Sequence, residues 1–391
     1  MKSVETDVQR YSDCLRPAQN AGLFLGFAMA TNFARTRVRM SLTFIALIQQ
    51  AKPLLDAGHF GEASNAYRAA LQSAASTPEK IAALLGLGRA CLGLADYAQA
   101  RAHNRAAFAY CVSDTGVPDS VAATCHHALG QSLLGLGSLS LAQRQFQQAL
   151  ALRMYAFGKQ HRATLSSMFM LGITHHRLGH IRRAAAIHTE CLDRRKAVLA
   201  FDDADITASL QAVAQIHFAK QEFDASLCLH QEALRRMQAH RQTPIAHEAA
   251  AWNAVGQALQ RLGRYEAARE HLQRAEELFS ISLGAQHPDT ASVWLNLADL
   301  YLSSQPVNSL ELSQKAHAVM ISCMGVSHPR TAAAAISVAR VLHRCGQYEA
   351  ARALLGSAIN TLGKGLRKSH PEVLKARRLA TACAVEFLAK K

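Results

Sequence analysis

The string LGAQHPDT (residues 283–290) lies between two stretches with the hydrophobic spacing of helices. Related strings are FGKQHRAT (157–164), MGVSHPRT (324–331) and LRKSHPEV (366–373). Their histidines stand at positions 161, 287, 328 and 370, so the successive gaps are 126, 41 and 42 residues. Since 126 is three times 42, the strings mark a unit that recurs about every 42 residues. A fixed period of this length predicts a solenoid of stacked repeats.

A second landmark repeats at a similar step. LGRYEAA (262–268) and CGQYEAA (345–351) are near copies, and weaker versions occur in the other units. The counterparts of Gly263 are Gly58, Ala95, Gly137, Gly179, Gln221 and Gly346, with Gln305 as an approximate one. LSSQPVN (302–308) departs from the pattern at that last position. Together the landmarks predict about eight units over residues 42–362.

Each unit has the hydrophobic pattern of two helices. Trp252, Val255 and Leu259 follow at i, i+3 and i+7, which predicts one buried stripe of a helix. Gly256 lies beside this stripe, where the missing side chain lets a partner helix approach closely. A turn follows at Gly263, and a second helix is expected to begin near Tyr265. The inward-facing residues of that second helix are Ala268, Leu272 and Ala275.

The string at 283–290 is interpreted as a joint between two helix pairs. Gly284 ends one helix, because glycine is favoured just past a helix C-terminus. Pro288 starts the next helix, where its fixed φ fits the first turn. Asp289 adds negative charge to that turn, which the helix dipole favours. Histidines 287, 328 and 370 are expected to serve in capping or loop packing.

Composition and charge support a helical, basic protein. Half of the residues are hydrophobic but only 6% are aromatic, and alanine is frequent, which favours closely packed helices over sheets. The formal net charge of +15 fits an acidic peptide, an acidic protein tail, nucleic acid or an anionic membrane surface. The nine cysteines form no CxxC pair, which favours reduced thiols in a cytosolic compartment.

The N-terminal residues do not follow the repeat pattern. Their longest apolar run, AGLFLGFAMA (21–30), is shorter than the ~18 residues that a membrane span needs. Glu5, Asp7 and Asp13 precede it, whereas transit peptides are poor in acidic residues. Residues 1–41 are therefore expected to be an extension that is poorly ordered or loosely packed, with a targeting role left open. Residues 363–391 are expected to form a C-terminal capping helix, since a repeat array otherwise exposes its last apolar face.

The repeat resembles a known family. The residues that carry the resemblance are Trp252, Val255, Gly256, Leu259, Gly263, Tyr265, Ala268, Leu272 and Ala275. This pattern resembles the tetratricopeptide repeat, and the 42-residue period with its LG-x-x-HP-x-T joint is similar to the repeats of kinesin light chains. The chain lacks the long N-terminal heptad coiled coil of a kinesin light chain, so the resemblance extends to the repeat and its peptide binding and not to the motor. It implies an all-α fold, a right-handed superhelical solenoid of antiparallel helix pairs.

The resemblance also implies that first helices line a concave, peptide-binding groove. On the best-formed unit the unburied face carries Asn253, Gln257 and Arg261. Amides can form hydrogen bonds with an extended peptide backbone, and arginines can bind carboxylates. Phe169 and Phe218 can contact an apolar anchor residue of the peptide. The groove candidates are Arg89, His127, Gln131, His176, Arg177, Gln211, Gln215, Asn253, Gln257, Arg261, Arg340 and Arg344. The competing interpretation is a solvated helix face that is basic because the whole chain is basic.

Signals of catalysis or metal binding are not found. The chain has no HExxH, no zinc-finger spacing of Cys and His, and no GxxxxGK[ST], GxGxxG after a strand, or GxSxG. Adjacent pairs such as His126–His127 point to different sides of a helix and cannot grip one ion. His175 and His217 fall on buried stripes, where a hydrogen-bonded core histidine is expected. No enzyme, metal or cofactor is predicted.

The sequence thus predicts a non-enzymatic scaffold or adaptor that binds a protein or peptide segment, acidic or mixed in charge, in the groove. Two alternatives stay open: a basic helical-repeat protein that binds RNA, and a regulatory subunit of a separate enzyme or transcription factor. A regular row of aromatic residues for base stacking is absent, which disfavours RNA. The expected location is the cytoplasm, and the resemblance implies an association with the cytoskeleton.

Overall fold

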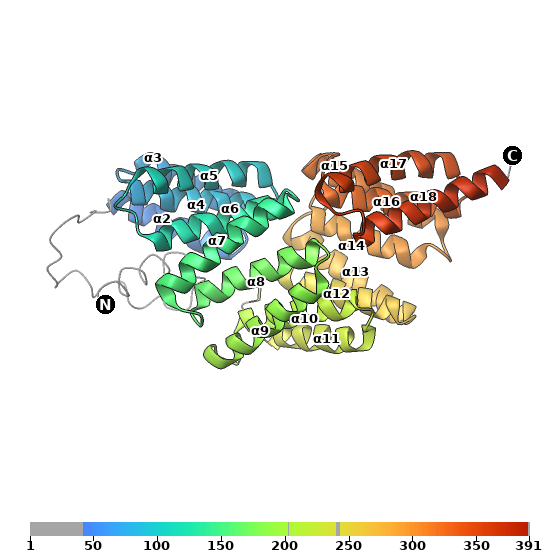
Figure 1. Cartoon of the computed structure of the whole chain (residues 1–391), viewed down its shortest axis with the longest axis horizontal. Coiled ribbons are helices and arrows are strands. Elements are labelled where there is room, and N and C mark those ends of the chain that lie inside the picture. The colour runs from blue at the N-terminus through green and yellow to red at the C-terminus, as the bar shows by residue number, and fades with distance from the viewer. Residues whose placement is uncertain (1–41, 202, 240–242, 390–391) are drawn as a thin grey trace. The chain divides into compact units, whose positions relative to one another are not determined.

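The computed structural model describes residues 42–201, 203–239 and 243–389 (Figure 1). Across these ranges the chain forms seventeen α-helices and no β-strand, which confirms the predicted all-α fold. The N-terminal extension expected at 1–41 lies outside the described residues. The helices are α2 (Leu42–Asp56), α3 (Phe60–Ser73), α4 (Thr77–Gly93), α5 (Tyr97–Ser113), α6 (Asp119–Gly135), α7 (Leu139–Phe157), α8 (Arg162–Arg177), α9 (Ile181–Val198), α10 (Ala204–Ala219), α11 (Phe223–Ala239), α12 (Ile245–Arg261), α13 (Tyr265–Ser282), α14 (Pro288–Tyr301), α15 (Pro306–Met324), α16 (Pro329–Arg344), α17 (Tyr348–Gly365) and α18 (Pro371–Ala389).

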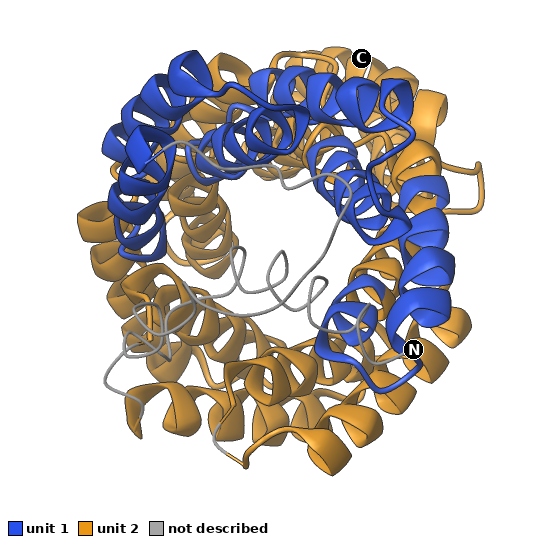
Figure 2. Cartoon of the chain, turned by 90° about the vertical axis from the view of Figure 1, so that its left-hand side faces the viewer, with its two compact units in different colours: residues 1–133, 144–167 blue, residues 134–143, 168–391 orange. Residues whose placement is uncertain are grey.

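The chain divides into two compact units, shown in different colours in Figure 2. Unit 1 contains residues up to 133 together with 144–167, and unit 2 contains 134–143 together with 168–391. In both units consecutive helices pack in pairs, α4 with α5 in unit 1 and α12 with α13 in unit 2 being examples. The predicted stacking of helix pairs is therefore present in each unit.

The turn within each pair depends on one residue with a positive φ. Gly263, the reference position of the sequence pattern, has φ +76°, in the left-handed region that favours glycine. The predicted counterparts share this conformation: Gly58, Ala95, Gly137, Gly179, Gln221 and Gly346, with φ between +58° and +85°. Gln305 is the exception, with φ −140°, and it precedes Pro306 at the start of α15. The departure of LSSQPVN from the repeat pattern is thus a departure in backbone conformation.

The joint around residue 287 is a compact hydrogen-bonded motif. Gly284 follows α13 with φ +85°, and Pro288 is the first residue of α14, as predicted. The Nδ1 atom of His287 accepts a hydrogen bond from the backbone N–H of Asp289 at 3.1 Å, which caps α14. The Thr290 hydroxyl donates to the Gly284 carbonyl at 2.8 Å. His, Pro and Thr in the motif therefore all act in ending one helix and starting the next.

The histidine cap recurs at the other joints. His328 accepts from the N–H of Arg330 at 3.0 Å, and Thr331 donates to the Gly325 carbonyl at 2.9 Å. His370 accepts from the N–H of Glu372 at 3.2 Å. The capping role expected for these histidines is confirmed, and it requires a neutral ring because a protonated Nδ1 cannot accept a hydrogen bond.

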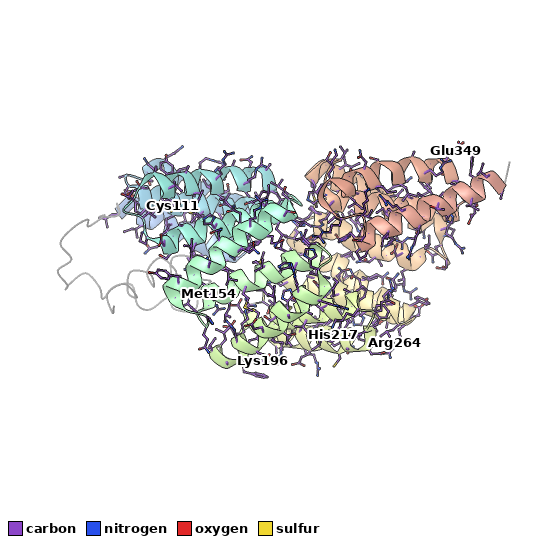
Figure 3. All side chains as sticks on the ribbon, in the orientation of Figure 1. Cys111, Met154, Lys196, His217, Arg264 and Glu349 are labelled. Carbon is purple, nitrogen blue, oxygen red and sulfur yellow. The ribbon has the colours of Figure 1, made fainter. Side chains whose placement is uncertain are left out.

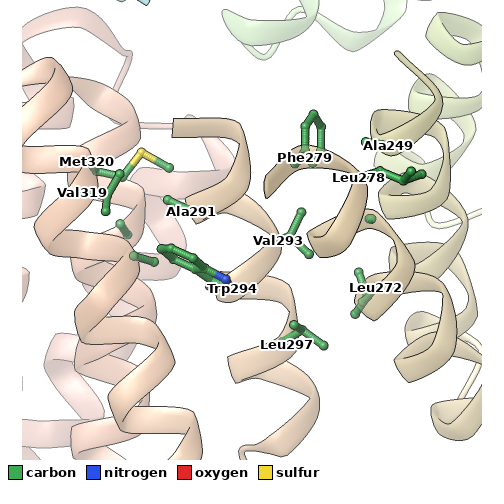
Figure 4. Packing of buried hydrophobic residues seen from close by; sticks show 13 residues of the cluster. Ala249, Leu272, Leu278, Phe279, Ala291, Val293, Trp294, Leu297, Val319 and Met320 are labelled. Carbon is green, nitrogen blue, oxygen red and sulfur yellow. The ribbon is translucent and has the colours of Figure 1, made fainter. Parts of the chain in front are cut away.

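Side chains from successive pairs interlock to form the core. In unit 2, Trp294 of α14 is 1% exposed and belongs to a cluster with Leu272 and Phe279 of α13 and Met320 of α15 (Figure 4). Its indole N–H donates to Glu276 at 2.7 Å, so the buried ring keeps a polar partner. Each first helix thus packs against the second helix on either side, and burial of this kind is the main stabilising contribution in a repeat array.

Candidate functional site

The twelve groove candidates all lie on first helices of their pairs, namely α4, α6, α8, α10, α12 and α16. Arg177, Gln215, Arg261 and Arg344 are exposed, and the other eight are half-buried. On α12 the candidates alternate with Val255 and Leu259, which are 0% and 4% exposed and form the core side. The candidates therefore occupy the polar faces of these helices.

First helices of neighbouring pairs touch one another in unit 2, α12 with α14 and α14 with α16. Polar side chains tie these helices together. The Nδ2 of Asn296 donates to the Oδ1 of Asn253 at 2.8 Å, and Arg340 forms an ion pair with Asp299 and donates to Ser337 at 3.0 Å. Asn253 and Arg340 therefore take part in holding first helices together, a role that the sequence pattern did not reveal.

Arg330 makes a similar tie at the joint. Its guanidinium donates to Asp289 at 2.7 Å and to Ser292 at 2.8 Å. Burial acts to raise the pKa of Asp289, but the charge of Arg330 and its hydrogen bond outweigh that effect and lower the pKa below its ordinary value. The ion pair therefore stays formed at neutral pH and links the first turns of α14 and α16.

Arg261 lies against two aromatic rings. Its guanidinium is 4.9 Å from the centroid of Phe223 and 6.0 Å from that of Phe218, and the two rings contact edge to face at 5.3 Å. Both rings are half-buried, whereas Arg261 is exposed. The rings restrict the arginine without neutralising it, so its charge stays directed to solvent. An arginine beside aromatic rings is a composition typical of binding hot spots.

Arg177, at the end of α8, takes part in contacts within unit 2. The guanidinium of Arg177 donates to the carbonyl of Leu134 at 3.2 Å, and its own carbonyl lies 3.2 Å from the Nε2 of His370. Burial, followed by the charges of Arg177 and His370, lowers the pKa of His176. Arg177 is therefore engaged in the fold, and its charge acts on the neighbouring His176.

In unit 1 the candidate His127 lies close to a buried arginine of α7, Arg153. An Arg153 nitrogen lies 3.3 Å from the Nδ1 of His127 and 2.9 Å from the hydroxyl of Ser167. Burial, followed by the charges of Arg153 and Arg89, lowers the pKa of His127 well below its ordinary value. His127 of α6 and Arg153 of α7 thus form a basic pair, and the charge of Arg89 on α4 also acts on His127.

The four amide candidates and Arg344 have no side-chain hydrogen bond within the described ranges of the chain. The amides are Gln131, Gln211, Gln215 and Gln257. They are spread over α6, α10 and α12, so the structure does not bring all twelve candidates into one cluster. The amides without a side-chain hydrogen bond lie on α6, α10 and α12, and Arg344 lies on α16.

Two residues that sequence reasoning missed are Arg153 on α7 and Arg195 on α9. Both belong to second helices, which were not searched for binding residues. They are 42 residues apart, and so are the serines that they contact, Ser167 and Ser209. The 42-residue spacing shared by the arginines and the serines is the sequence signal that could have revealed them.

The expectation for His217 was wrong. Its side chain is 30% exposed, and its Nδ1 lies 2.5 Å from a carboxylate oxygen of Glu222. It stands in the last turn of α10 and is one of the side chains labelled in Figure 3. His175 is 5% exposed, as expected, and lies 3.2 Å from His180 between their Nδ1 atoms.

Residues 42–201, 203–239 and 243–389 contain no group of three His, Cys, Asp or Glu side chains arranged to hold a metal ion. The eight cysteines among them are free thiols. No helix in the same ranges is long and apolar enough to cross a membrane.

Solved structures with this fold include two Rap proteins. One is a Rap protein complexed with Competence and Sporulation Factor, with a TM-score of 0.58, 11% identity, and coverage of 90% of this chain and 100% of that chain. The other is the Rap conjugation gene regulator of the plasmid pLS20 in complex with the Phr* peptide, with a TM-score of 0.61, 12% identity, and coverage of 87% and 97%. At this identity the likeness establishes the fold alone.

Sequence relatives include plant proteins. Protein KINESIN LIGHT CHAIN-RELATED 1 of Arabidopsis thaliana is 25% identical over 240 residues, which cover 61% of this chain and 39% of the plant protein. KINESIN LIGHT CHAIN-RELATED 2 of the same plant is also 25% identical, over 56% of this chain and 34% of its own length. The chain therefore spans well under half the length of these relatives.

Family models described as tetratricopeptide repeat match residues 48–110, 120–197, 247–306 and 331–372. Together they cover more than half of the chain and fall on the helix pairs of both units. The turn residues with positive φ, the capped joints and these matches agree, and the chain belongs to the tetratricopeptide repeat family.

Proposed function

We propose that this protein is a non-enzymatic adaptor that binds a peptide segment of a protein partner along the polar faces of its first helices. The observation that carries the proposal is the placement of Arg261. Its exposed charge is restricted by Phe218 and Phe223, and unengaged amides lie on the same and neighbouring first helices. Amides can bond an extended backbone while the arginine holds a carboxylate of the same peptide.

The fold supports this proposal. The two Rap structures described above were solved with a peptide factor or peptide bound, so a helical array of this kind has room for such a ligand. The net charge of +15 favours an acidic partner, since opposite charge increases the rate of encounter. The likeness to kinesin light chain-related proteins leads us to propose a cytoplasmic adaptor that associates with the cytoskeleton.

The test is a capture experiment with the full chain and two charge-reversed variants. Arg261→Glu removes the positive charge beside the two phenylalanines. Arg264→Glu is the matched control, because Arg264 is equally exposed and only three residues away but precedes α13 at the turn (Figure 3). A negative charge there is favourable to the helix dipole, so the control variant should fold normally. Each protein is incubated with nuclease-treated and untreated lysate from the source cells.

The proposal predicts protein partners that are captured by wild type and Arg264→Glu, lost with Arg261→Glu and unaffected by nuclease. Partners retained equally by all three proteins would contradict the placement of the site on this face. Recovery of RNA, or of partners that disappear with nuclease, would instead support nucleic-acid binding, and steep salt dependence would accompany it.

A further inference from the structure

Arg153 and Arg195 occupy equivalent positions in consecutive repeats. Arg153 is 6% exposed and donates to the carbonyl of Ala163 at 2.8 Å and to Ser167 at 2.9 Å. Arg195 is 2% exposed and donates to the carbonyl of Asp205 at 2.7 Å and to the hydroxyl of Ser209 at 2.8 Å. Both arginines therefore reach from a second helix to the first turns of the next first helix.

The charge of Arg195 is compensated within unit 2. A carboxylate oxygen of Asp205 lies 3.9 Å from its guanidinium, and the ring of Phe169 lies 4.6 Å from it. An ion pair and an aromatic face both offset the cost of burying a cation. In this repeat a carboxylate and an aromatic ring therefore both lie beside the buried cation.

The charge of Arg153 lacks both of these partners. The residue at the position of Asp205 is Ala163, and the residue at the position of Phe169 is His127, each 42 residues earlier. No carboxylate of the described residues lies within ion-pair distance of Arg153. Burial lowers the pKa of Arg153 to about 10, which leaves it charged at neutral pH. A buried cation without a counter-ion is costly, so this part of unit 1 favours the arrival of an anion.

His127 provides a second donor at the same place. The guanidinium of Arg153 and the hydroxyl of Ser167 both reach the Nδ1 atom of His127, at 3.3 Å and 3.1 Å. Because a guanidinium can only donate, Nδ1 accepts, and the proton of the neutral ring stands on Nε2. The ring is half-buried and lies on the polar face of α6, so its Nε2–H is available to an acceptor that approaches along the first helices.

We propose that His127 and Arg153, here called the Arg153 site, bind a carboxylate group of the peptide ligand. The inference rests on the proposed function and adds the chemical group that unit 1 recognises. The carboxylate takes the place that Asp205 fills in the next repeat, accepts from His127 and neutralises Arg153. An acidic side chain and a free C-terminus both supply this group.

The chain itself indicates which substitutions the fold tolerates. One repeat further along, the Arg and Ser positions are held by Met237 and Ala251, so Arg153→Met with Ser167→Ala copies a natural repeat. Ala163→Asp copies Asp205 and gives Arg153 an internal counter-ion in the first turn of α8. The matched control, Arg195→Met with Ser209→Ala, makes the same change in unit 2 and leaves the Arg153 site intact.

The experiment uses immobilised full chain and a synthetic pool of 12-residue peptides of mixed sequence. One half of the pool has free C-terminal carboxylates and the other half is amidated, and retained peptides are sequenced by mass spectrometry. Wild type and the control are expected to retain peptides with Asp or Glu enriched at one position, or peptides retained only in the free-acid half. Ala163→Asp and the Arg153→Met double variant should retain these about tenfold less, the loss expected for a charge-assisted bond.

Melting temperature gives a readout that does not depend on a peptide. Ala163→Asp should raise the melting temperature by roughly 1–3 °C through its new ion pair, and Asp205→Ala should lower it. A rise with Ala163→Asp together with loss of carboxylate-dependent binding supports the Arg153 site, and it excludes misfolding as the cause of the loss.

Two results would overturn the inference. The first is that wild type selects peptides with no carboxylate preference, and the second is that the preference persists in both unit 1 variants. In either case peptide binding itself stands and only the Arg153 site fails. Retention of no peptide by wild type would contradict the proposed function as well.

Discussion

The Nε2 atom of His328 lies 2.7 Å from the carbonyl oxygen of Gly135, although 193 residues separate them. His370 makes the same contact with the carbonyl of Arg177 at 3.2 Å, again 193 residues earlier. All four residues belong to unit 2. Since Nδ1 of each histidine caps its own helix, the other ring nitrogen carries the proton that the distant carbonyl accepts. One side chain therefore supports a helix start and a long-range contact.

Substitution of His328 separates these two roles. His328→Ala should lower the free energy of unfolding by about 2 kcal/mol, because a helix cap and a hydrogen bond are each worth about 1 kcal/mol. His328→Asp should lose only part of this, since aspartate caps α16 but cannot donate to Gly135. Urea denaturation of the full chain, followed by circular dichroism, measures both variants. Equal losses would show that the cap contributes nothing.

Stability should fall as the pH drops below about 6.5. Burial lowers the pKa of both His188 and His230 to about 4, whereas an unfolded histidine has a pKa of about 6.5. The unfolded chain therefore binds protons more readily, and the stability that neutral rings provide at pH 7 is lost between pH 6.5 and about 4. Burial also lowers the pKa of His328, which adds to the loss.

His188→Phe tests the histidine contribution to this pH dependence. Residue 146, the counterpart one repeat earlier, is a phenylalanine whose ring meets His127 edge to face, just as His188 meets Phe169. The variant should fold, and its loss of stability between pH 7 and pH 4.5 should be smaller than that of wild type by about 1–3 kcal/mol. Thermal melts at a series of pH values measure the difference. An unchanged pH profile would contradict the role of this residue.

Two substitutions at the turn positions should change stability in opposite directions. Gln221 adopts φ +66° at the site where other repeats have glycine, and a left-handed conformation costs a residue with a side chain roughly 1 kcal/mol. Gln221→Gly should therefore stabilise unit 2 by roughly 0.5–1 kcal/mol. Gly263→Gln should destabilise it by a similar amount. Space is not the cause, because a Cβ at Gly263 would meet no atom within 4 Å. Denaturant midpoints of the two variants should move in opposite directions.

The last helix is expected to act as a cap. Val373, Ala376 and Cys383 of α18 are at most 1% exposed and pack in a cluster with α16 and α17. Deletion of residues 370–391 would expose Leu355 and Leu362 of α17, so melting temperature and solubility should both decrease.

A pair of point variants separates packing from charge in this cap. Val373→Asp places a carboxylate in the cluster and should lower the melting temperature strongly, as burial of an unpaired charge does. Lys375→Asp changes the charge of an exposed position on the same helix and should have little effect. Similar melts for the deletion and the full chain, without new aggregation, would show that α18 is not a cap.

The local structure of the repeats could be predicted because it is encoded locally. Gly263 and its counterparts mark turns in which a short segment must adopt a positive φ, and the 42-residue step identified even Ala95 and Gln221 correctly. The joint at Gly284 and Pro288 was predictable for the same reason, since helix ends depend on residues within one turn of each other. The buried stripe with Val255 and Leu259 followed from helical spacing alone.

The candidate site was less predictable, because a polar residue on a first helix has several possible partners. Asn253 was selected as a free amide, but its oxygen is bound by Asn296 of the next first helix. His217 was expected in the core, but its side chain is 30% exposed and lies against the carboxylate of Glu222. Arg153 was overlooked because it lies on a second helix and reaches its partners through the space between two pairs.

The residues of this chain therefore specify the helices, turns and joints, because each depends on interactions within a few positions. Which polar groups meet depends on the stacking of the pairs. The contact of His328 with Gly135 joins parts of unit 2 that are 193 residues apart, and no interaction within a few positions specifies it. The difference between the neutralised Arg195 and the unneutralised Arg153 likewise became visible only when the neighbours of each guanidinium were placed in space.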